Sequence, residues 1–347
     1  MKVTKKLFGE INWENVYEYT LKNDKGIEIS CLDYGCVITK IVTPDRHGKY
    51  ENIVLGFEDI ESYREKSPYF GAVVGRVAGR IKGGEFELEG RTYTLANNDG
   101  KNHLHGGVKG FNDVIWEAEI TEGEDEIKIE FSYTSLDGEE GYPGNLDVKV
   151  EYILNNDNEF IIQYKAETDK TTLFNPTNHS YFNLSGNLKR DVLEHSLKVD
   201  SSKFLEIDEE LLPTGKVLEV SDTVFDFRKG RKIKEGVSSN YIQNKIVGQG
   251  YDHTFILNSN NSEILLWDEE SGRKLVMNTD APAVVLYTSN QLEEGMDLYG
   301  VSSRSYLGLC LETQIPPDAI HHESFPDCIL RPEEIFISRT KYTFSLE

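Results

Sequence analysis

The chain has few cysteines and lacks any long apolar run. Four cysteines in 347 residues are too sparse for a disulfide scaffold, which favours reduced thiols. The segment Met1–Glu10 begins with lysines, as secretion signals do, but the apolar stretch of such a signal does not follow. No segment reaches the roughly 18 apolar residues that a membrane-spanning helix requires. We therefore expect a cytoplasmic protein that does not cross a membrane.

Basic side chains are scarce in relation to acidic ones. The chain carries 60 Asp and Glu residues against 37 Lys and Arg residues, a formal net charge of -23. A field of this sign repels phosphate backbones and anionic lipid headgroups, so neither nucleic acid nor a membrane surface is an expected partner. The acidic residues are spread along the whole chain, which is typical of a solvated surface.

Helical periodicity is nearly absent, and short segments that alternate between apolar and polar residues take its place. Alternation with a period of two is typical of half-buried antiparallel strands. Turn clusters rich in Asn and Gly, such as Asn23–Gly26 and Asn97–Gly100, separate the segments. This punctuation predicts an all-β sandwich or barrel. The clearest alternating segments are Glu28–Leu32, Glu85–Leu88, Glu126–Tyr133, Asp147–Leu154 and Phe160–Lys165.

The sequence has no internal repeat, no low-complexity tract and no linker rich in Pro or Ser. We therefore expect residues 1–347 to form a single domain. A short helix is expected to start within Asp59–Tyr63, as the one exception to the strand pattern. Three aromatic side chains, Tyr63, Phe70 and Trp116, fit either the core or a binding cleft.

Histidine is the first candidate for catalysis, because its pKa of about 6.5 lets it act as an acid or a base near neutral pH. His105 lies in Asn102–Gly107, where paired glycines let the backbone approach a ligand closely. His179 lies in Asn175–Leu184, a polar stretch with aromatic residues. Such side chains suit a sugar, whose hydroxyls need hydrogen bonds and whose C–H faces pack on rings.

Two carboxylates complete the candidate chemistry. Asp252 follows a glycine turn, and Glu312 follows the apolar segment Tyr306–Leu311. A carboxylate at the end of a buried strand is partly desolvated, which raises its pKa and its basicity.

These landmarks, taken in order, resemble the aldose 1-epimerase (galactose mutarotase) family over nearly the whole chain. One matching segment could arise by chance, but many in the same order could not. The matching segments are Tyr34-Gly35, Pro44–Gly48, Asn52–Phe57, Gly75–Ile81, Asn102–Gly107, Asp137–Gly144, Asn178–Leu184, Leu212–Gly215, Gly250–His253, Leu311–Gln314, Pro317-Asp318 and Phe325-Pro326.

The resemblance implies a large antiparallel β-sandwich with an open sugar cleft, and an isomerase that interconverts the α and β anomers of a free aldose. It implies Glu312 as the general base on the C1 hydroxyl and His179 as the general acid on the ring oxygen. His105 would assist at the ring oxygen, and Arg80 and Asp252 would bind sugar hydroxyls. No cofactor or metal is expected, and the protein is expected to be a monomer or a homodimer.

The roles of two of the binding residues have plain structural alternatives. Arg80 could instead form a buried ion pair, and Asp252 could be a turn or capping residue. Asn97, in the Asn-rich turn before His105, is a further candidate for binding the sugar.

The sequence departs from the family pattern at two positions. Gly79 stands where many members have Asn, and Val285 stands where many have Gln. The resemblance implies that both usual residues are amides that bind sugar, so their loss leaves the natural sugar open. We hypothesise that the enzyme acts on aldoses other than galactose, or on a broader range of aldoses than galactose alone.

Three other functions compete with this interpretation. A cupin-like metal enzyme could use His103, His105, His179 and Glu312 as ligands, although Gly106–Gly110 occupies the place where a cupin has a Glu. A carbohydrate-binding module could have lost its chemistry while keeping the fold. A relative of the same fold could act on a pentose, a disaccharide or a sugar phosphate, although no Lys/Arg cluster for a phosphate lies near the motifs.

Overall fold

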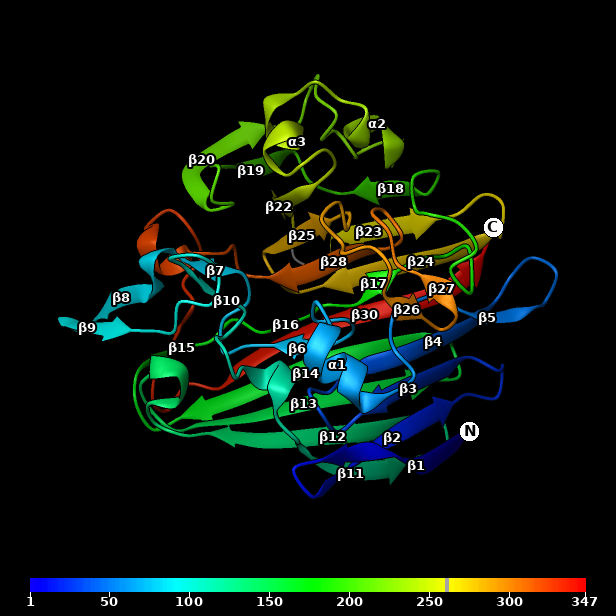
Figure 1. Ribbon diagram of the computed structural model, residues 1–347, viewed down its shortest axis with the longest axis horizontal. Coiled ribbons are helices and arrows are strands. Elements are labelled where there is room, and N and C mark those ends of the chain that lie inside the picture. The colour runs from blue at the N-terminus through cyan, green and yellow to red at the C-terminus, as the bar shows by residue number, and fades with distance from the viewer. Residues whose placement is uncertain (260–261) are drawn as a thin grey trace.

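A computed structural model describes residues 1–259 and 262–347, and antiparallel strands make up most of it (Figure 1). The largest sheet has nine strands, and its order is not the chain order, because β30 pairs with both β14 and β24. Its strands are, in spatial order, β11 (Glu117–Glu122), β12 (Glu126–Ser135), β13 (Leu146–Asn155), β14 (Glu159–Thr168), β30 (Phe336–Leu346), β24 (Arg273–Thr279), β23 (Glu263–Trp267), β18 (Ser196–Val199) and β21 (Arg231–Lys232).

A six-stranded sheet and a five-stranded sheet accompany it. The six-stranded sheet consists of β17 (Tyr181–Phe182), β28 (Leu309–Gln314), β25 (Ala283–Tyr287), β22 (Asp252–Ile256), β19 (Lys203–Ile207) and β20 (Pro213–Glu219). The five-stranded sheet consists of β1 (Lys2–Ile11), β2 (Glu14–Lys22), β3 (Glu28–Leu32), β4 (Ile38–Pro44) and β5 (Tyr50–Asn52).

Short strand pairs extend the ends of these sheets. Figure 1 shows β7 to β10 grouped at one side of the molecule, beside the ends of β25 and β28. The pairs are β7 (Arg80–Ile81) with β10 (His103–Leu104), β8 (Glu85–Leu88) with β9 (Arg91–Thr94), β6 (Val73–Val74) with β16 (Thr177–Asn178), β15 (Thr172–Leu173) with β29 (Ile329–Leu330), and β26 (Asp297–Leu298) with β27 (Val301–Ser302).

Helices within the described residues are few and short. The helix α1 (Ile60–Lys66) starts where the sequence predicts, because the Asp59 carboxylate accepts a hydrogen bond from the Ser62 N–H at 2.7 Å. Each helix of this part of the chain is too short or too polar to cross a membrane. The others are α2 (Lys234–Val237), α3 (Ile242–Ile246) and the 3₁₀ turns η1 (Lys82–Gly84), η2 (Phe111–Asp113), η3 (Glu139–Gly141) and η4 (Ala319–His321).

The alternation read from the sequence sets which side chains enter the core. In β13, Val148, Val150 and Tyr152 are buried, while Asp147 and Lys149 on either side of Val148 are exposed. One hydrophobic cluster takes residues from all three large sheets, for example Ile29, Val150 and Leu309. The predicted all-β antiparallel sandwich is therefore confirmed, and all five alternating segments lie within strands.

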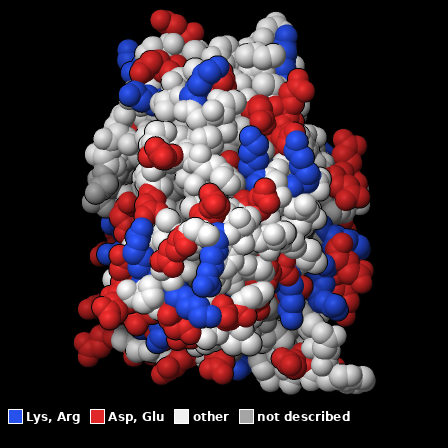
Figure 2. All heavy atoms as spheres, turned by 90° about the vertical axis from the view of Figure 1, so that its left-hand side faces the viewer, with Lys and Arg blue, Asp and Glu red and all other residues white. Residues whose placement is uncertain are grey.

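The three aromatic residues that the sequence leaves open belong to the core. Tyr63 and Phe70 pack in one hydrophobic cluster and Trp116 in another, and all three are buried. The surface is charged: Figure 2 shows basic and acidic side chains interspersed over the side of the molecule that carries β8, β9 and β20.

Candidate active site

A pocket of about 190 Å³ opens on one face of the six-stranded sheet. Side chains alternate between the two faces of a strand, so residues two apart share a face. This is why Glu312 and Gln314 of β28 both reach the pocket, as do Val285 and Tyr287 of β25. Other strands add Asp252, Thr254, Tyr181, Ile207, Arg80, Leu104 and Pro213, and the surrounding loops add Pro68, Tyr69, Gly79, His105, His179, Leu211, Gln291 and Pro317.

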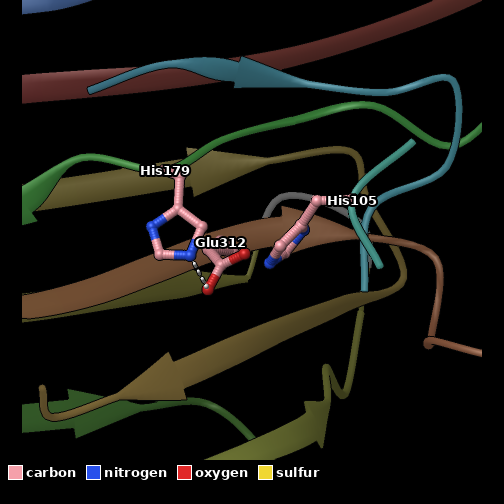
Figure 3. Close-up of side chains that lie close together, drawn as sticks. All are labelled: His105, His179 and Glu312. Atoms are coloured by element: carbon pink, nitrogen blue, oxygen red, sulfur yellow. Dashed lines mark ion pairs between the residues drawn. The ribbon is translucent and has the colours of Figure 1, made fainter. Parts of the chain in front are cut away.

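The three predicted catalytic residues meet in this pocket. Figure 3 shows the Glu312 carboxylate between the His179 and His105 rings, with His179 Nε2 directed at Glu312. His179 Nε2 lies 3.6 Å from Glu312 Oε1, and one ligating atom of each of the three residues lies within 4.8 Å of the others. All three residues are at least nine-tenths buried. A buried carboxylate and a buried imidazole thus lie side by side in the pocket lining.

Aromatic rings fix the plane of His179. The residue follows β16, and its backbone N–H donates to Ala72 O at 2.8 Å. Its imidazole stacks on Tyr181, with ring centroids 5.0 Å apart and planes at 25°, and on Tyr69, at 5.8 Å and 28°. Stacking on both rings limits how far the imidazole can tilt, so Nε2 stays aimed at Glu312.

A glycine-rich loop positions His105. Gly106 has φ of 90°, and a Cβ at that position would lie 1.7 Å from the carbonyl oxygen of Gly75. Only a glycine at position 106 therefore lets the backbone come this close to the Gly75 carbonyl. The backbone N–H of Gly79 donates to His105 Nδ1 at 3.1 Å. Since an N–H can only donate, Nδ1 must be unprotonated, and the neutral ring carries its hydrogen on Nε2.

Burial shifts the pKa of Glu312, His179 and His105 in the direction that favours the neutral form of each. Burial raises the pKa of Glu312 well above 4.5, the negative charge of Asp252 raises it further, and Arg80 lowers it. Burial lowers the pKa of His179 to about 4, with a hydrogen bond to its own backbone working in the opposite direction. Burial also lowers the pKa of His105, and His179 adds to that effect.

The pocket also contains Arg80 and Asp252, which the sequence assigns to sugar binding. Arg80 lines the pocket and also pairs with Asp99, with Nε 2.7 Å from Oδ2, so the binding role and the ion pair coexist. Asp252 is the first residue of β22 and reaches the pocket floor. Burial raises its pKa, and Arg80 partly offsets that rise.

Two other residues named from the sequence stand apart from the pocket. Asn97 is exposed, and its side-chain oxygen lies against Gly84, 1.9 Å from where a Cβ of that residue would be. His103 supports the loop: its Nδ1 contacts Ala96 O at 2.7 Å and its Nε2 contacts the Tyr142 hydroxyl at 2.8 Å. These two contacts occupy both ring nitrogens of His103.

The donor chemistry of the cluster suits proton transfer better than a metal. A histidine that binds a metal through Nε2 donates its other N–H to an acceptor. His105 Nδ1 instead accepts the Gly79 N–H, which leaves a hydrogen on the nitrogen that faces the pocket. Since His103 is engaged elsewhere, the ligand set of the cupin-like alternative is reduced to His179 and Glu312.

Several pocket residues were not assigned a role from the sequence. Tyr69 lies 110 positions before His179 in the chain, and no local pattern connects it with that ring. Gln314 lies inside a matching segment, two residues after Glu312, and strand alternation would have placed both on one face. Gln314 Oε1 is buried and has no hydrogen-bond partner among the described residues.

Comparisons with known proteins agree with this site. The family model for aldose 1-epimerase matches residues 17–343. The chain is 39% identical over 354 residues to a galactose mutarotase of Bos taurus, covering 100% of this chain and 99% of the relative. It is 33% identical over 338 residues to an aldose 1-epimerase of Escherichia coli (strain K12), covering 94% of this chain and 95% of the relative.

A solved structure gives the same result for the fold. The galactose 1-epimerase of Lactobacillus acidophilus NCFM superposes with a TM-score of 0.89 at 32% sequence identity, covering 99% of both chains. The family model and the relatives thus match nearly the whole chain, including the strands and loops that build the pocket. This chain belongs to the aldose 1-epimerase family.

Proposed function

We propose that this protein interconverts the α and β anomers of a free aldose by opening and reclosing the sugar ring. The observation that carries the proposal is that Glu312 Oε1 and His179 Nε2 lie 3.6 Å apart, with both side chains buried in the lining of the pocket. Opening a pyranose requires a proton to leave O1 while another reaches the ring oxygen. A carboxylate and an imidazolium side by side supply both functions.

In the opening step, Glu312 takes the proton of the C1 hydroxyl and His179 gives its Nε2 proton to the ring oxygen. The C1–O5 bond breaks and C1 becomes an aldehyde. After rotation about the C1–C2 bond, the C5 hydroxyl attacks the other face of the aldehyde. Glu312 then returns its proton to O1 and His179 recovers its proton, so that every atom and proton balances.

The pair needs one shared proton in total. Before a sugar binds, the raised pKa of Glu312 and the lowered pKa of His179 place that proton on Glu312. The reactive state has it on His179, which is reached by a transfer over 3.6 Å without a change in total charge. Arg80 lowers the pKa of Glu312, and sugar hydroxyls that donate to the carboxylate act in the same direction.

His105 has a different role, because its hydrogen is fixed on Nε2. It donates a hydrogen bond from Nε2 toward the ring oxygen but does not transfer that proton. Arg80 offers donors and Asp252 offers acceptors to the neighbouring hydroxyls. The rings of Tyr69 and Tyr287 provide apolar surface for the C–H faces of the sugar.

The proposed substrates include aldoses other than galactose. Two lining positions support this: Val285 presents an isopropyl group beside Glu312 on the neighbouring strand, and Gly79 presents only backbone. Neither side chain can hydrogen-bond a hydroxyl, so the pocket discriminates weakly between sugars that differ there. Turnover of glucose and pentoses at rates similar to galactose would support this breadth, and a strong preference for galactose would contradict it.

We also propose a single domain over residues 1–347, located in the cytoplasm as a monomer or a homodimer. The hydrophobic cluster shared by the three large sheets supports one domain. The four cysteines, all buried and unpaired, support a reducing compartment.

The function is tested by dissolving pure α-D-glucose and α-D-galactose and following optical rotation. Wild-type protein is expected to accelerate the approach to equilibrium, and Glu312→Gln or His179→Asn to lower that acceleration by about 10²–10⁴-fold. Glu61→Gln, on the exposed side of α1, is the control. A wild-type rate equal to that of buffer for these sugars, pentoses and maltose, together with sugar binding, would favour the carbohydrate-binding alternative.

A further inference from the structure

The sulfur of Cys310 lies against the catalytic histidine. Cys310 Sγ is 3.5 Å from Nδ1 of His179, which is within hydrogen-bond reach for sulfur. We infer that Cys310 is a positioning residue that accepts the Nδ1–H of His179 and so keeps Nε2 free to exchange a proton with Glu312. This inference rests on the proposed acid–base function of His179.

Strand geometry explains why the thiol meets this ring. Cys310 lies two residues before Glu312 on β28, so both side chains point to the same face. Cys310 also lies opposite Tyr181 in the pairing of β28 with β17, and the Tyr181 ring stacks on the imidazole of His179. The thiol is completely buried, and the contact is therefore shielded from water.

The direction of the hydrogen bond follows from the chemistry of the pair. His179 must alternately hold and lack a hydrogen on Nε2, so its neutral form needs the hydrogen on Nδ1. That hydrogen needs an acceptor. The sulfur of Cys310 is the side-chain acceptor beside Nδ1, whereas the His179 carbonyl, which also bonds its own ring, is shared with the Gly71 N–H at 3.0 Å.

A neutral thiol is a suitable acceptor for a proton carrier. Burial raises the pKa of Cys310 well above 9, so the thiol keeps its hydrogen and the sulfur is only a weak acceptor. A carboxylate in the same place would stabilise the imidazolium and make it a poorer acid. The thiol thus orients the ring without reducing the acidity that ring opening requires.

The two histidines of the site are then set in opposite ways. The Gly79 N–H fixes the hydrogen of His105 on Nε2, whereas the Cys310 sulfur fixes that of His179 on Nδ1. Both rings face the pocket with Nε2, but only His179 can receive a proton there. The structure thereby distinguishes the proton carrier from the hydrogen-bond donor.

The test uses ¹⁵N-histidine NMR of the full-length protein, with His179→Asn to assign the signals. Wild-type His179 is expected to show a protonated Nδ1 and an unprotonated Nε2 at neutral pH. Cys310→Val, which removes the acceptor at similar size, is expected to raise the Nε2–H form and to lower kcat about two- to tenfold, with KM changed less than twofold. Cys310→Ser, which restores an acceptor, is expected to recover part of kcat.

The control is Cys31→Val, which replaces another completely buried thiol on a strand outside the pocket. It reports the general cost of losing a core thiol and is expected to leave kcat and the His179 spectrum unchanged. A wild-type His179 with its hydrogen on Nε2, or an unchanged spectrum and kcat in a folded Cys310→Val, would overturn the inference. Because NMR reads the ring without turnover, loss of the proposed function would be recognised separately.

Discussion

His105 and His179 bring the same nitrogen, Nε2, to the pocket, yet their hydrogens are placed differently. The difference arises from single contacts at Nδ1, a backbone N–H for His105 and a sulfur for His179. The family resemblance implies different roles for the two histidines, and these contacts give a physical reason for the difference. At the scale of one residue, the hydrogen-bond partner of Nδ1 therefore determines whether Nε2 can receive a proton or can only donate a hydrogen bond.

The pH dependence of activity tests the shared proton of Glu312 and His179. As pH falls through about 4, His179 gains a proton while Glu312 is still protonated, and the pair loses its base. As pH rises past the raised pKa of Glu312, the pair loses its only proton. We therefore expect kcat/KM to be bell-shaped, with an acid limb near pH 4.

The measurement is kcat/KM for anomer exchange between pH 3 and pH 10, corrected for the spontaneous rate. An activity that keeps rising below pH 4 would contradict the shared-proton account. An alkaline limb at the ordinary pKa of a glutamate would contradict the effect of burial on Glu312.

At the scale of elements, β28 supplies much of the site. Cys310, Glu312 and Gln314 are two residues apart and share one face of the strand, where Glu312 and Gln314 line the pocket and Cys310 contacts His179. A slip of one residue in the pairing of β28 with β25 would turn all three away. The loop that carries His105 depends in the same way on the close approach of Gly106 to Gly75.

The loop is tested by Gly106→Ala. The new Cβ would overlap the Gly75 carbonyl, so we expect a loss of about 3 kcal/mol or more in the free energy of unfolding and a large fall in kcat as His105 moves. Gly100→Ala is the matched control, because Gly100 also has a positive φ but open space around it. It should cost only about 1–2 kcal/mol and leave kcat unchanged. Equal effects of both substitutions, measured by chemical denaturation and polarimetry, would refute the role of the close approach.

Sequence patterns predicted the strands and the first helix because both are local signals, and the family resemblance supplied the pair Glu312 and His179. Alternation located the strands, and Asp59 marked the start of α1. Contacts between distant segments were not readable, such as the stacking of Tyr69 on His179. Asn97 was assigned to sugar binding from an Asn-rich turn, but that turn directs its side chain to Gly84 and solvent, and the binding role remains a prediction without support from the pocket lining.

At the scale of the whole molecule, the core contains neutral histidines. Burial lowers the pKa of His253 to about 3 and that of His179 to about 4. Between these values and about 6.5, the unfolded chain binds protons that the folded protein does not. Their contribution to stability is thus present above pH 6.5 and is lost as pH falls. Asp33, whose pKa burial raises to about 6, acts in the opposite direction.

The contribution of His253 to the pH dependence of stability is isolated by His253→Asn. His253 lies against Phe225, with ring centroids 4.8 Å apart, and its Nδ1 accepts the Asp252 N–H at 3.1 Å, a bond that the Asn oxygen can retain. Between pH 6.5 and 4, the free energy of unfolding should change less steeply with pH in the variant, by about 1.4 kcal/mol per pH unit. Urea denaturation at a series of pH values gives the free energy of unfolding of wild type and variant. Plotted against pH, the two curves should run parallel above pH 7. Equal slopes below pH 6.5 would show that His253 titrates alike in both states.

Glu312 and His179 are proposed to open the sugar ring by proton transfer without a metal. The most direct measurement is two-dimensional exchange NMR of the anomeric protons of D-glucose and D-galactose, with protein treated with a chelator. We expect α–β cross-peaks at undiminished intensity, and their loss with Glu312→Gln. Cross-peaks that vanish with the chelator and return with zinc would contradict it.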